Sequence, residues 1–304
     1  MVPSTTVYIA HFVAFLTVCV WGTTFVWTKL LLMSGLSPAN IFTLRSAIAY
    51  VLLAGFSAWK HFRKSPEERR ARSRIPWRDE LMMVLLGLTG GSLYFLTENA
   101  AMLYTTATNT SLIVCSCPLF AALLIGLCYR STDRMTVRQA VGSGVAFAGM
   151  AVVVLNGRFV LHLSPVGDAL AFGACLCWAV YSLLMREMGG RYSTLLLTRK
   201  VFFYGLLTII PYYIVFPEWP QWSLVCRSDV MFSLLFLGCI ASMVCFLTWN
   251  WCMVKLGAVR ATNWVYLNPI TTIVFAAIIL HEPLTPWLLC GTLAILAGIK
   301  YSGT

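Results

Sequence analysis

Apolar residues run almost without interruption along this chain, in stretches of roughly 18 residues or more. A run of that length crosses the hydrocarbon core of a bilayer as a helix, because lipid offers no partner for unpaired backbone groups. Charged residues make up only 11% of the 304 residues, too few to cover one large soluble core. Runs such as residues 82–88 lack the alternation of a membrane β-barrel. We therefore predict an all-α membrane protein.

Ten stretches of the chain are predicted to be transmembrane helices. The first is not preceded by a basic segment and continues past Trp27, so we interpret it as a retained span rather than a cleaved signal peptide. The predicted spans cover residues 8–31, 39–59, 81–104, 106–127, 137–155, 166–185, 195–216, 230–253, 258–280 and 284–301.

Basic residues are distributed unevenly between the two sides that these spans define. Residues 60–80 carry eight Lys and Arg residues, and the other connections on that side add eight more, ending with Lys300. The loops on the opposite side carry only Arg158 and Arg227. The positive-inside rule therefore places both termini in the cytoplasm, for a protein of the cell (inner) membrane. We interpret the net charge of +11 as this topology signal and expect no nucleic acid, with binding of anionic membrane lipid by the basic segment as the alternative.

The second half of the chain repeats the first. Leu96-Thr97-Glu98-Asn99 aligns with Leu247-Thr248-Trp249-Asn250 at an offset of 151 residues. An odd number of spans in each repeat inverts the second half in the membrane, so we predict two inverted five-helix repeats, residues 8–155 and 166–301. The other aligned pairs, in the same order along both halves, are Trp21 with Trp178, Arg45 with Arg199, Pro118 with Pro269, Gly142 with Gly291 and Gly149 with Gly298.

Several residues in these spans are typical of one known family. They are Trp21-Gly22, Pro38, Arg45, residues 107–118, Trp178, Pro269, Glu282-Pro283-Leu284-Thr285, Gly291 and Gly298. On these residues, and over nearly its whole length, the chain resembles the EamA-type members of the drug/metabolite transporter superfamily. Asp133-Arg134 stands where the family commonly has Glu followed by a basic residue. The resemblance implies a central cavity between the two halves, export of amino acids or related metabolites, and coupling to protons or to solute exchange.

Charged side chains inside the predicted spans are the first candidates for substrate binding. An ionisable group in hydrocarbon is unfavourable unless it faces a cavity or a partner. Glu98 is the only carboxylate well inside a span, and Arg45 and Lys29 lie at comparable depth. Glu98 could bind a proton or a cationic substrate group while Arg45 or Lys29 meets a carboxylate. Alternatively, Glu98 and Arg45 neutralise each other between helices.

Aromatic side chains at helical spacing form a second group of candidates. Trp21 and Thr24 share one face of the first span, and Trp178 and Tyr181 repeat that spacing in the sixth. Tyr94 lies one turn before the carboxylate in the third span. Such a lining would accept planar or apolar groups and attract cations, whereas packing is the alternative role.

Three further residues of the aligned motif and two prolines complete the candidates. Trp249 replaces the carboxylate in the second repeat, which makes the two half-sites chemically unequal. Asn99 and Asn250 recur in both repeats, and they either bridge helices or bind substrate. Pro118 and Pro269 predict helix kinks near the middle of their spans.

The sequence carries no pattern of an enzyme. It contains no Gly-rich phosphate loop and no His-Glu metal motif, so we expect neither a cofactor nor a bound metal. The prediction is a secondary active transporter that moves a small metabolite by alternating access, with export as the expected direction and protons as the candidate coupling ion. A multidrug exporter of lipophilic cations and a passive channel-like facilitator are the alternatives. The oligomeric state is not readable from these spans.

Overall fold

The computed structural model describes residues 4–63, 75–105, 107–128, 136–155, 164–280 and 286–301. Within these residues every element of regular secondary structure is a helix, and the one β-contact is an isolated bridge between Gly189 and Tyr192. The all-helical prediction is therefore confirmed for the described chain. Residues 282–285 and the pair Asp133-Arg134 lie outside it.

Six helical segments of the described chain are long and apolar enough to cross a membrane. The remaining predicted spans contain shorter helices, and the count of ten stays a prediction. The six segments are α1 (Ser4–Met33), α2 (Pro38–Phe62), α4 (Trp77–Gly87) with η1 (Leu88–Ser92) and α5 (Leu93–Tyr104), α9 (Pro165–Met188), α10 (Thr194–Thr208) with α11 (Ile210–Val215), and α13 (Ser228–Leu235) with η2 (Phe236–Val244) and α14 (Cys245–Leu256). The shorter helices are α6 (Ala107–Val114), α7 (Cys117–Cys128), α8 (Val137–Leu155), α12 (Trp222–Val225), α15 (Ala258–Thr262), η3 (Asn263–Leu267), α16 (Asn268–Leu280) and α17 (Pro286–Tyr301).

Serine and proline fix the starts of three of these helices. Ser37, Ser164 and Ser193 each accept a hydrogen bond from a backbone N–H of the first turn that follows, in α2, α9 and α10. Pro38 and Pro165 occupy the first helical position, where no N–H is needed. A serine cap of this kind stabilises a helix by about 1 kcal/mol.

Two long segments are interrupted at matching places in the two halves. The π-helical turn η1 separates α4 from α5, and η2 separates α13 from α14. Gly91 in η1 has φ −125° and ψ −106°, which is not helical. π-Helical turns are frequent at functional sites because the extra residue changes the direction of the side chains around it.

The helices that contain the predicted kinks are also interrupted. α6 ends at Val114 and α7 starts at Cys117, directly before Pro118. In the second half the 3₁₀ turn η3 leads into α16 immediately before Pro269. Both breaks follow from proline chemistry, because the ring removes an amide donor and disfavours a helical residue before it.

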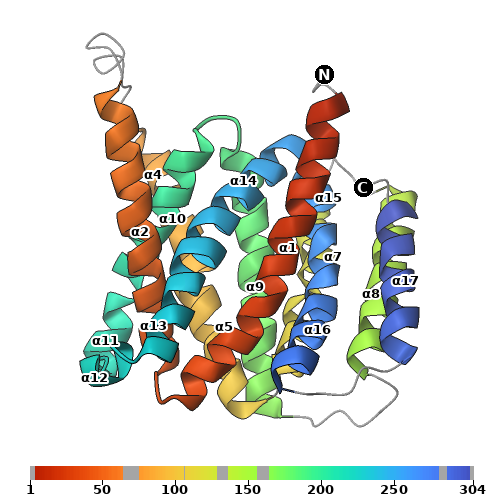
Figure 1. The fold of residues 1–304 in the computed structure, drawn as a ribbon. Coiled ribbons are helices and arrows are strands. Elements are labelled where there is room, and N and C mark those ends of the chain that lie inside the picture. The colour runs from red at the N-terminus through yellow and green to blue at the C-terminus, as the bar shows by residue number, and fades with distance from the viewer. Residues whose placement is uncertain are drawn as a thin grey trace.

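The aligned glycines bring α8 and α17 into close contact at one edge of the bundle (Figure 1). A Cβ added to Gly149 would lie 2.8 Å from the backbone oxygen of Gly291, and one added to Gly298 would lie 2.5 Å from the backbone oxygen of Gly142. The contact is therefore reciprocal between the two halves of the chain. Small residues allow this approach of two helix backbones in a membrane.

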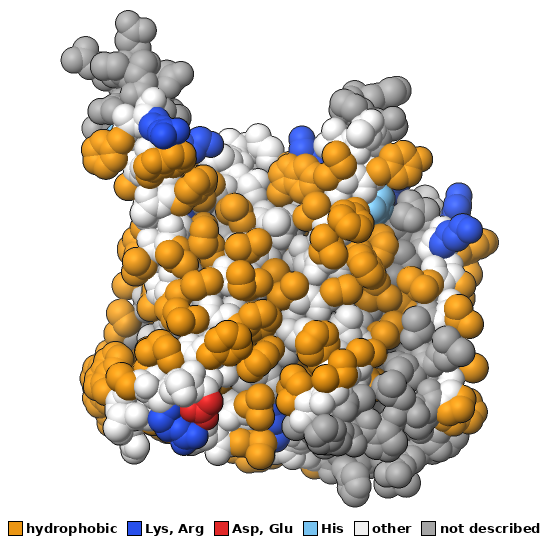
Figure 2. All heavy atoms as spheres, viewed as in Figure 1, with side chains coloured by type: hydrophobic (Ala, Val, Ile, Leu, Met, Phe, Trp, Pro, Cys, Tyr) orange, Lys and Arg blue, Asp and Glu red, His pale blue; other side chains and the backbone are white. Residues whose placement is uncertain are grey.

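Apolar side chains cover the outside of the molecule. Figure 2 shows them over the middle of the visible face, while Lys and Arg lie toward its two ends. Trp59, Trp77 and Trp219 are among the large exposed side chains. The start of α1 and the ends of α2 and α17 lie at the same end of the bundle (Figure 1). An apolar belt of this extent suits contact with lipid rather than with water.

Candidate functional site

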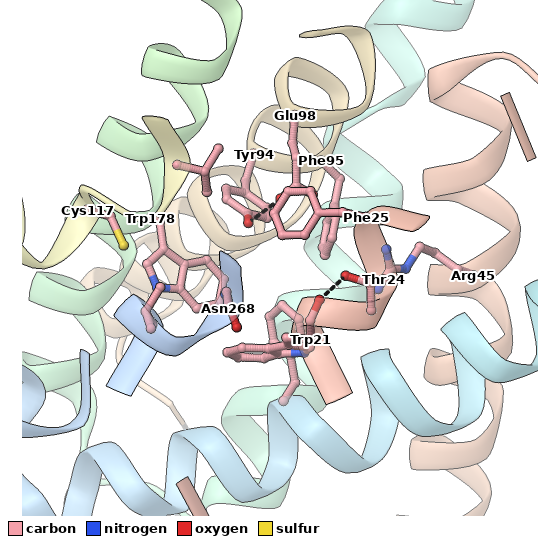
Figure 3. A pocket seen from close by; sticks show the side chains of 13 residues that line it. Trp21, Thr24, Phe25, Arg45, Tyr94, Phe95, Glu98, Cys117, Trp178 and Asn268 are labelled. Atoms are coloured by element: carbon pink, nitrogen blue, oxygen red, sulfur yellow. Dashed lines mark hydrogen bonds between the residues drawn. The ribbon is translucent and has the colours of Figure 1, made fainter. Parts of the chain in front are cut away.

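A cavity of about 440 Å³, including the part that opens to the outside, lies among helices of both halves (Figure 3). Helices α1, α2, α5, α6 and α7 contribute from the first half, and α9, α14, η3 and α16 from the second. Six of the predicted site residues line it, namely Trp21, Thr24, Arg45, Tyr94, Glu98 and Trp178.

Glu98 reaches the cavity from α5 and is only 7% exposed. Tyr94, one helical turn earlier on the same face, donates a hydrogen bond from its hydroxyl to Glu98 Oε1 at 2.7 Å (Figure 3). In the part of the chain that the structure describes, the carboxyl group makes no other hydrogen bond. Its second oxygen can therefore meet a proton or a cationic group of a ligand.

Arg45 reaches the same cavity from α2 and is 2% exposed. Its Nε donates to Ser242 Oγ in η2 at 2.9 Å, and its guanidinium carbon lies 4.4 Å from the centre of the Phe95 ring. Its two terminal nitrogens have no hydrogen-bond partner within the described residues. The side chain is thus held at Nε, while the fork that pairs with a carboxylate stays open.

Arg45 and Glu98 do not form an ion pair with each other. The side-chain nitrogens of Arg45 lie more than 4.0 Å from the carboxylate oxygens of Glu98. The Phe95 ring lies against the guanidinium instead. Two opposite buried charges that do not touch are unfavourable unless a further group meets them. The geometry therefore favours ligand binding over mutual neutralisation.

Aromatic rings fill the space around these charges. The Trp21 ring lies nearly perpendicular to Trp178, with centres 5.3 Å apart, and 5.5 Å from Phe246. The rings of Tyr94 and Trp178 are 5.0 Å apart. Trp21 Nε1 donates to the Ala241 carbonyl at 3.0 Å, which fixes its ring. Such contacts form a rigid wall that can accept flat, apolar or cationic groups.

Four predicted site residues lie behind this wall. Asn99 donates to a backbone carbonyl at the start of α2 at 3.1 Å, and Asn250 accepts from the Tyr181 hydroxyl at 2.6 Å. These bonds join helices, which is the alternative role that the sequence left open for the two amides. Trp249 is fully buried, and its ring centre lies 5.0 Å from that of Trp21. All four support the lining from outside the cavity.

Lys29 is also directed elsewhere. Its Nζ donates to the Met102 carbonyl at 2.7 Å, in the last turn of α5. A cation at this position satisfies a free carbonyl and complements the helix dipole. Of the two cationic candidates for a substrate carboxylate, Arg45 alone lines the cavity.

Seven lining residues were not predicted from the sequence. Six of them form three pairs at the repeat offset of 151 residues, so the offset relates their positions without saying that they face the cavity. The pairs are Phe95 with Phe246, Val114 with Val265, and Cys117 with Asn268, and the seventh residue is Phe25.

The charged residues depart from this symmetry. Glu98 is matched by Trp249, and the mate of Arg45, Arg199, donates to Ser57 Oγ at 3.0 Å outside the cavity. The lining is therefore a frame of paired positions with both of its charges on the first half. Among the described residues no group of three or more His, Cys, Asp or Glu side chains could hold a metal ion.

Polar contacts join the two halves at the end of the bundle where α4 begins. Asp79 Oδ2 accepts a hydrogen bond from the Tyr192 hydroxyl at 2.6 Å, which raises the pKa of Tyr192. Glu80 accepts from both Lys200 and Tyr204 of α10. Both acids lie in the first turn of α4, and their partners follow α9. These contacts tie the start of α4 to the residues that follow α9.

Comparison with known proteins gives a consistent result. The model of the EamA-like transporter family matches residues 8–155 and 165–302. An uncharacterized transporter of Archaeoglobus fulgidus is 27% identical over 293 residues, which cover 95% of both chains. A probable terminal-alkyne amino-acid exporter of Streptantibioticus cattleyicolor is 27% identical over 231 residues, 76% of this chain and 74% of the exporter. One crystal structure superposes with a TM-score of 0.72 at 18% identity, over 96% of this chain and 94% of its own, and so shares the fold.

These matches confirm the resemblance drawn from the sequence. The relatives are transporters, so an enzyme is excluded on family grounds. Together with the apolar helices, they establish a multi-pass protein of the cell membrane whose substrate is a small molecule. The chain belongs to the EamA-like transporter family, within the drug/metabolite transporter superfamily.

Proposed function

We propose that this chain is a ten-span secondary carrier that exports a small zwitterionic metabolite, an amino acid or a related compound. The observation that carries the proposal is the pair of buried charges, Arg45 and Glu98, which face one aromatic cavity without pairing with each other. The open guanidinium fork matches a carboxylate in two parallel hydrogen bonds. The free oxygen of Glu98 matches an ammonium group or takes up a proton.

A relative supports the substrate class. The similar protein of Streptantibioticus cattleyicolor is named as a probable exporter of an amino acid. Every amino acid carries the carboxylate and the ammonium that the cavity would bind. Proton coupling is part of the proposal, because Glu98 is the one acidic side chain in the described cavity lining.

The repeat supports alternating access as the mechanism. An inverted pair of repeats encloses the cavity, and rocking one half against the other would expose it to either side in turn. If both termini are cytoplasmic, the contacts of Asp79 and Glu80 close the cytoplasmic end. The described conformation is then one in which the cavity is sealed from the cytoplasm, and their rupture opens it inward.

The two alternatives fit less well. A lipophilic cation would bind Glu98 and the rings, but the buried charge of Arg45 at the same cavity would repel it. A channel would need a continuous path, and the contacts of Glu80 with Lys200 and Tyr204 of α10 are better suited to a gate that opens and closes. A carrier for zwitterions would bind its substrate through both charges and open the cavity to one side of the membrane at a time.

Efflux from proteoliposomes tests the proposal. The purified protein is reconstituted into liposomes that contain a pooled set of labelled metabolites. The loss of each metabolite is followed with and without an inward proton gradient, in which the outside is more acidic than the inside. Carrier-dependent loss of amino acids, stimulated by the gradient, is the expected result. Movement of lipophilic cations alone, or linear unsaturable leakage without counterflow, would replace the proposal by one of the alternatives.

A further inference from the structure

Two polar atoms in the wall of the cavity have no hydrogen-bond partner within the described residues. They are Nε1 of Trp178 and Oδ1 of Asn268, on side chains that are 4% and 6% exposed. Figure 3 shows both side chains across the cavity from Arg45. The other lining indole, Trp21, donates its Nε1 to a backbone carbonyl at 3.0 Å.

The Trp178 ring and the backbone of Asn268 are firmly placed. The centre of the Trp178 ring lies 5.0 Å from the ring centres of Tyr94 in α5 and of Tyr181 one turn later in α9. Asn268 is the first residue of α16, and its backbone carbonyl oxygen accepts hydrogen bonds from the hydroxyls of Thr271 and Thr272 at 2.9 Å. A buried donor and a buried acceptor are unfavourable without a partner.

The chemistry of the two atoms defines the group that would satisfy them. An indole N–H only donates, and an amide oxygen only accepts. A hydroxyl or a carboxamide group offers both functions at once. An ammonium group has no acceptor for the indole, and a carboxylate would meet the amide oxygen with like polarity. The pair therefore selects a neutral hydrogen-bonding group over a charged one.

We infer that Trp178 and Asn268 form a polar subsite that binds a hydroxyl or carboxamide group on the substrate side chain. This inference rests on the proposed function, in which Arg45 holds the carboxylate at the opposite side of the cavity. It narrows the substrate from any zwitterion to one whose side chain ends in a neutral polar group. A site built to hydrogen-bond such a group discriminates against the analogue that lacks it, because the buried atoms stay unpaired.

Two pairs of amino acids that differ by a hydroxyl test the subsite at two lengths. Proteoliposomes with the full-length protein are assayed for labelled threonine against valine, and for tyrosine against phenylalanine. The hydroxylated member of at least one pair is expected to be transported on the order of tenfold more efficiently. In Trp178→Phe and in Asn268→Leu the preference should fall to within about twofold, because each change removes one of the two bonds.

Trp249→Phe is the matched control. It also removes a buried indole N–H without a partner in the described chain, but Trp249 does not line the cavity. The preference within each pair should survive this change. Scoring the ratio within a pair removes differences in expression or folding between variants.

The outcomes separate this inference from the proposed function. Equal transport of both members of both pairs by the unmodified protein would overturn the polar subsite and leave the carrier. A preference that survives in both Trp178→Phe and Asn268→Leu would overturn it too. Absence of carrier-dependent movement of any zwitterion in the pooled-metabolite efflux assay would overturn the proposed function, and the inference with it.

Discussion

Replacing Arg45 with methionine is expected to abolish zwitterion transport without weakening the fold. The side chain is almost completely buried. Among the described residues, no carboxylate oxygen lies within 4.0 Å of its nitrogens to neutralise it. Its contacts are one hydrogen bond to Ser242 Oγ at 2.9 Å and the Phe95 ring at 4.4 Å. Methionine can fill much of the same space without the charge.

The expected magnitudes follow from these contacts. The variant loses one hydrogen bond from a charged group, about 1.5–3 kcal/mol, and a cation–π contact of about 1–2 kcal/mol. The variant is relieved of the desolvation penalty of an unpaired buried charge, which is several kcal/mol and offsets these losses. The free energy of unfolding should therefore change by less than about 2 kcal/mol in either direction. Transport loses a bidentate contact of about 3 kcal/mol, which is about a hundredfold.

Two assays on the same preparation separate these effects. Thermal unfolding in detergent is followed by tryptophan fluorescence, and amino-acid counterflow is measured in proteoliposomes. Arg199→Met is the control, because this repeat mate of Arg45 bonds Ser57 outside the cavity and should keep most transport. The reasoning would be refuted if the Arg45→Met protein still transported zwitterions, or if its unfolding temperature lay far below that of the unmodified protein.

Three further predictions concern other parts of the molecule. Glu98→Gln should remove the dependence of transport on a proton gradient, because an amide cannot take up a proton; a rate measured across a pH series that keeps its slope would contradict this. Glu80→Gln should loosen the closed end and speed modification of Cys117 by a small thiol reagent, measured by mass spectrometry of that peptide; an unchanged rate would contradict the closure. Asn250→Leu should lower the free energy of unfolding by about 2 kcal/mol, since it leaves the buried Tyr181 hydroxyl unpaired; an unaltered denaturant midpoint would show that this bond contributes little.

The helical membrane fold was predictable because hydropathy is a local property of the chain. The repeat added long-range information, since it matched Gly149 with Gly298 and Gly142 with Gly291. In the structure Gly149 packs against Gly291, and Gly298 packs against Gly142. The same offset relates Phe95 to Phe246 in the cavity lining. A sequence repeat thus predicts equivalent positions even where it does not say what they face.

The facing direction of each side chain was harder to predict. Glu98 and Asn99 are neighbours on α5, yet the first lines the cavity and the second bonds to α2. Helices buried in a membrane protein are apolar on every side, so the pattern does not single out the face toward a cavity. The π-helical turn η2 contains no proline that would have signalled it in the sequence. Its residue Ser242, which accepts the hydrogen bond from Arg45, was therefore not predicted.

The most direct test of a zwitterion site is competition in a counterflow assay with three compounds of one carbon skeleton. The set is an amino acid, the amine that lacks its carboxylate, and the acid that lacks its amino group. If Arg45 and Glu98 each bind one charge, only the complete amino acid competes strongly, and Arg45→Met removes its advantage over the amine. Equal competition by the amine and the amino acid in the unmodified protein would contradict the two-charge site and favour a cation exporter.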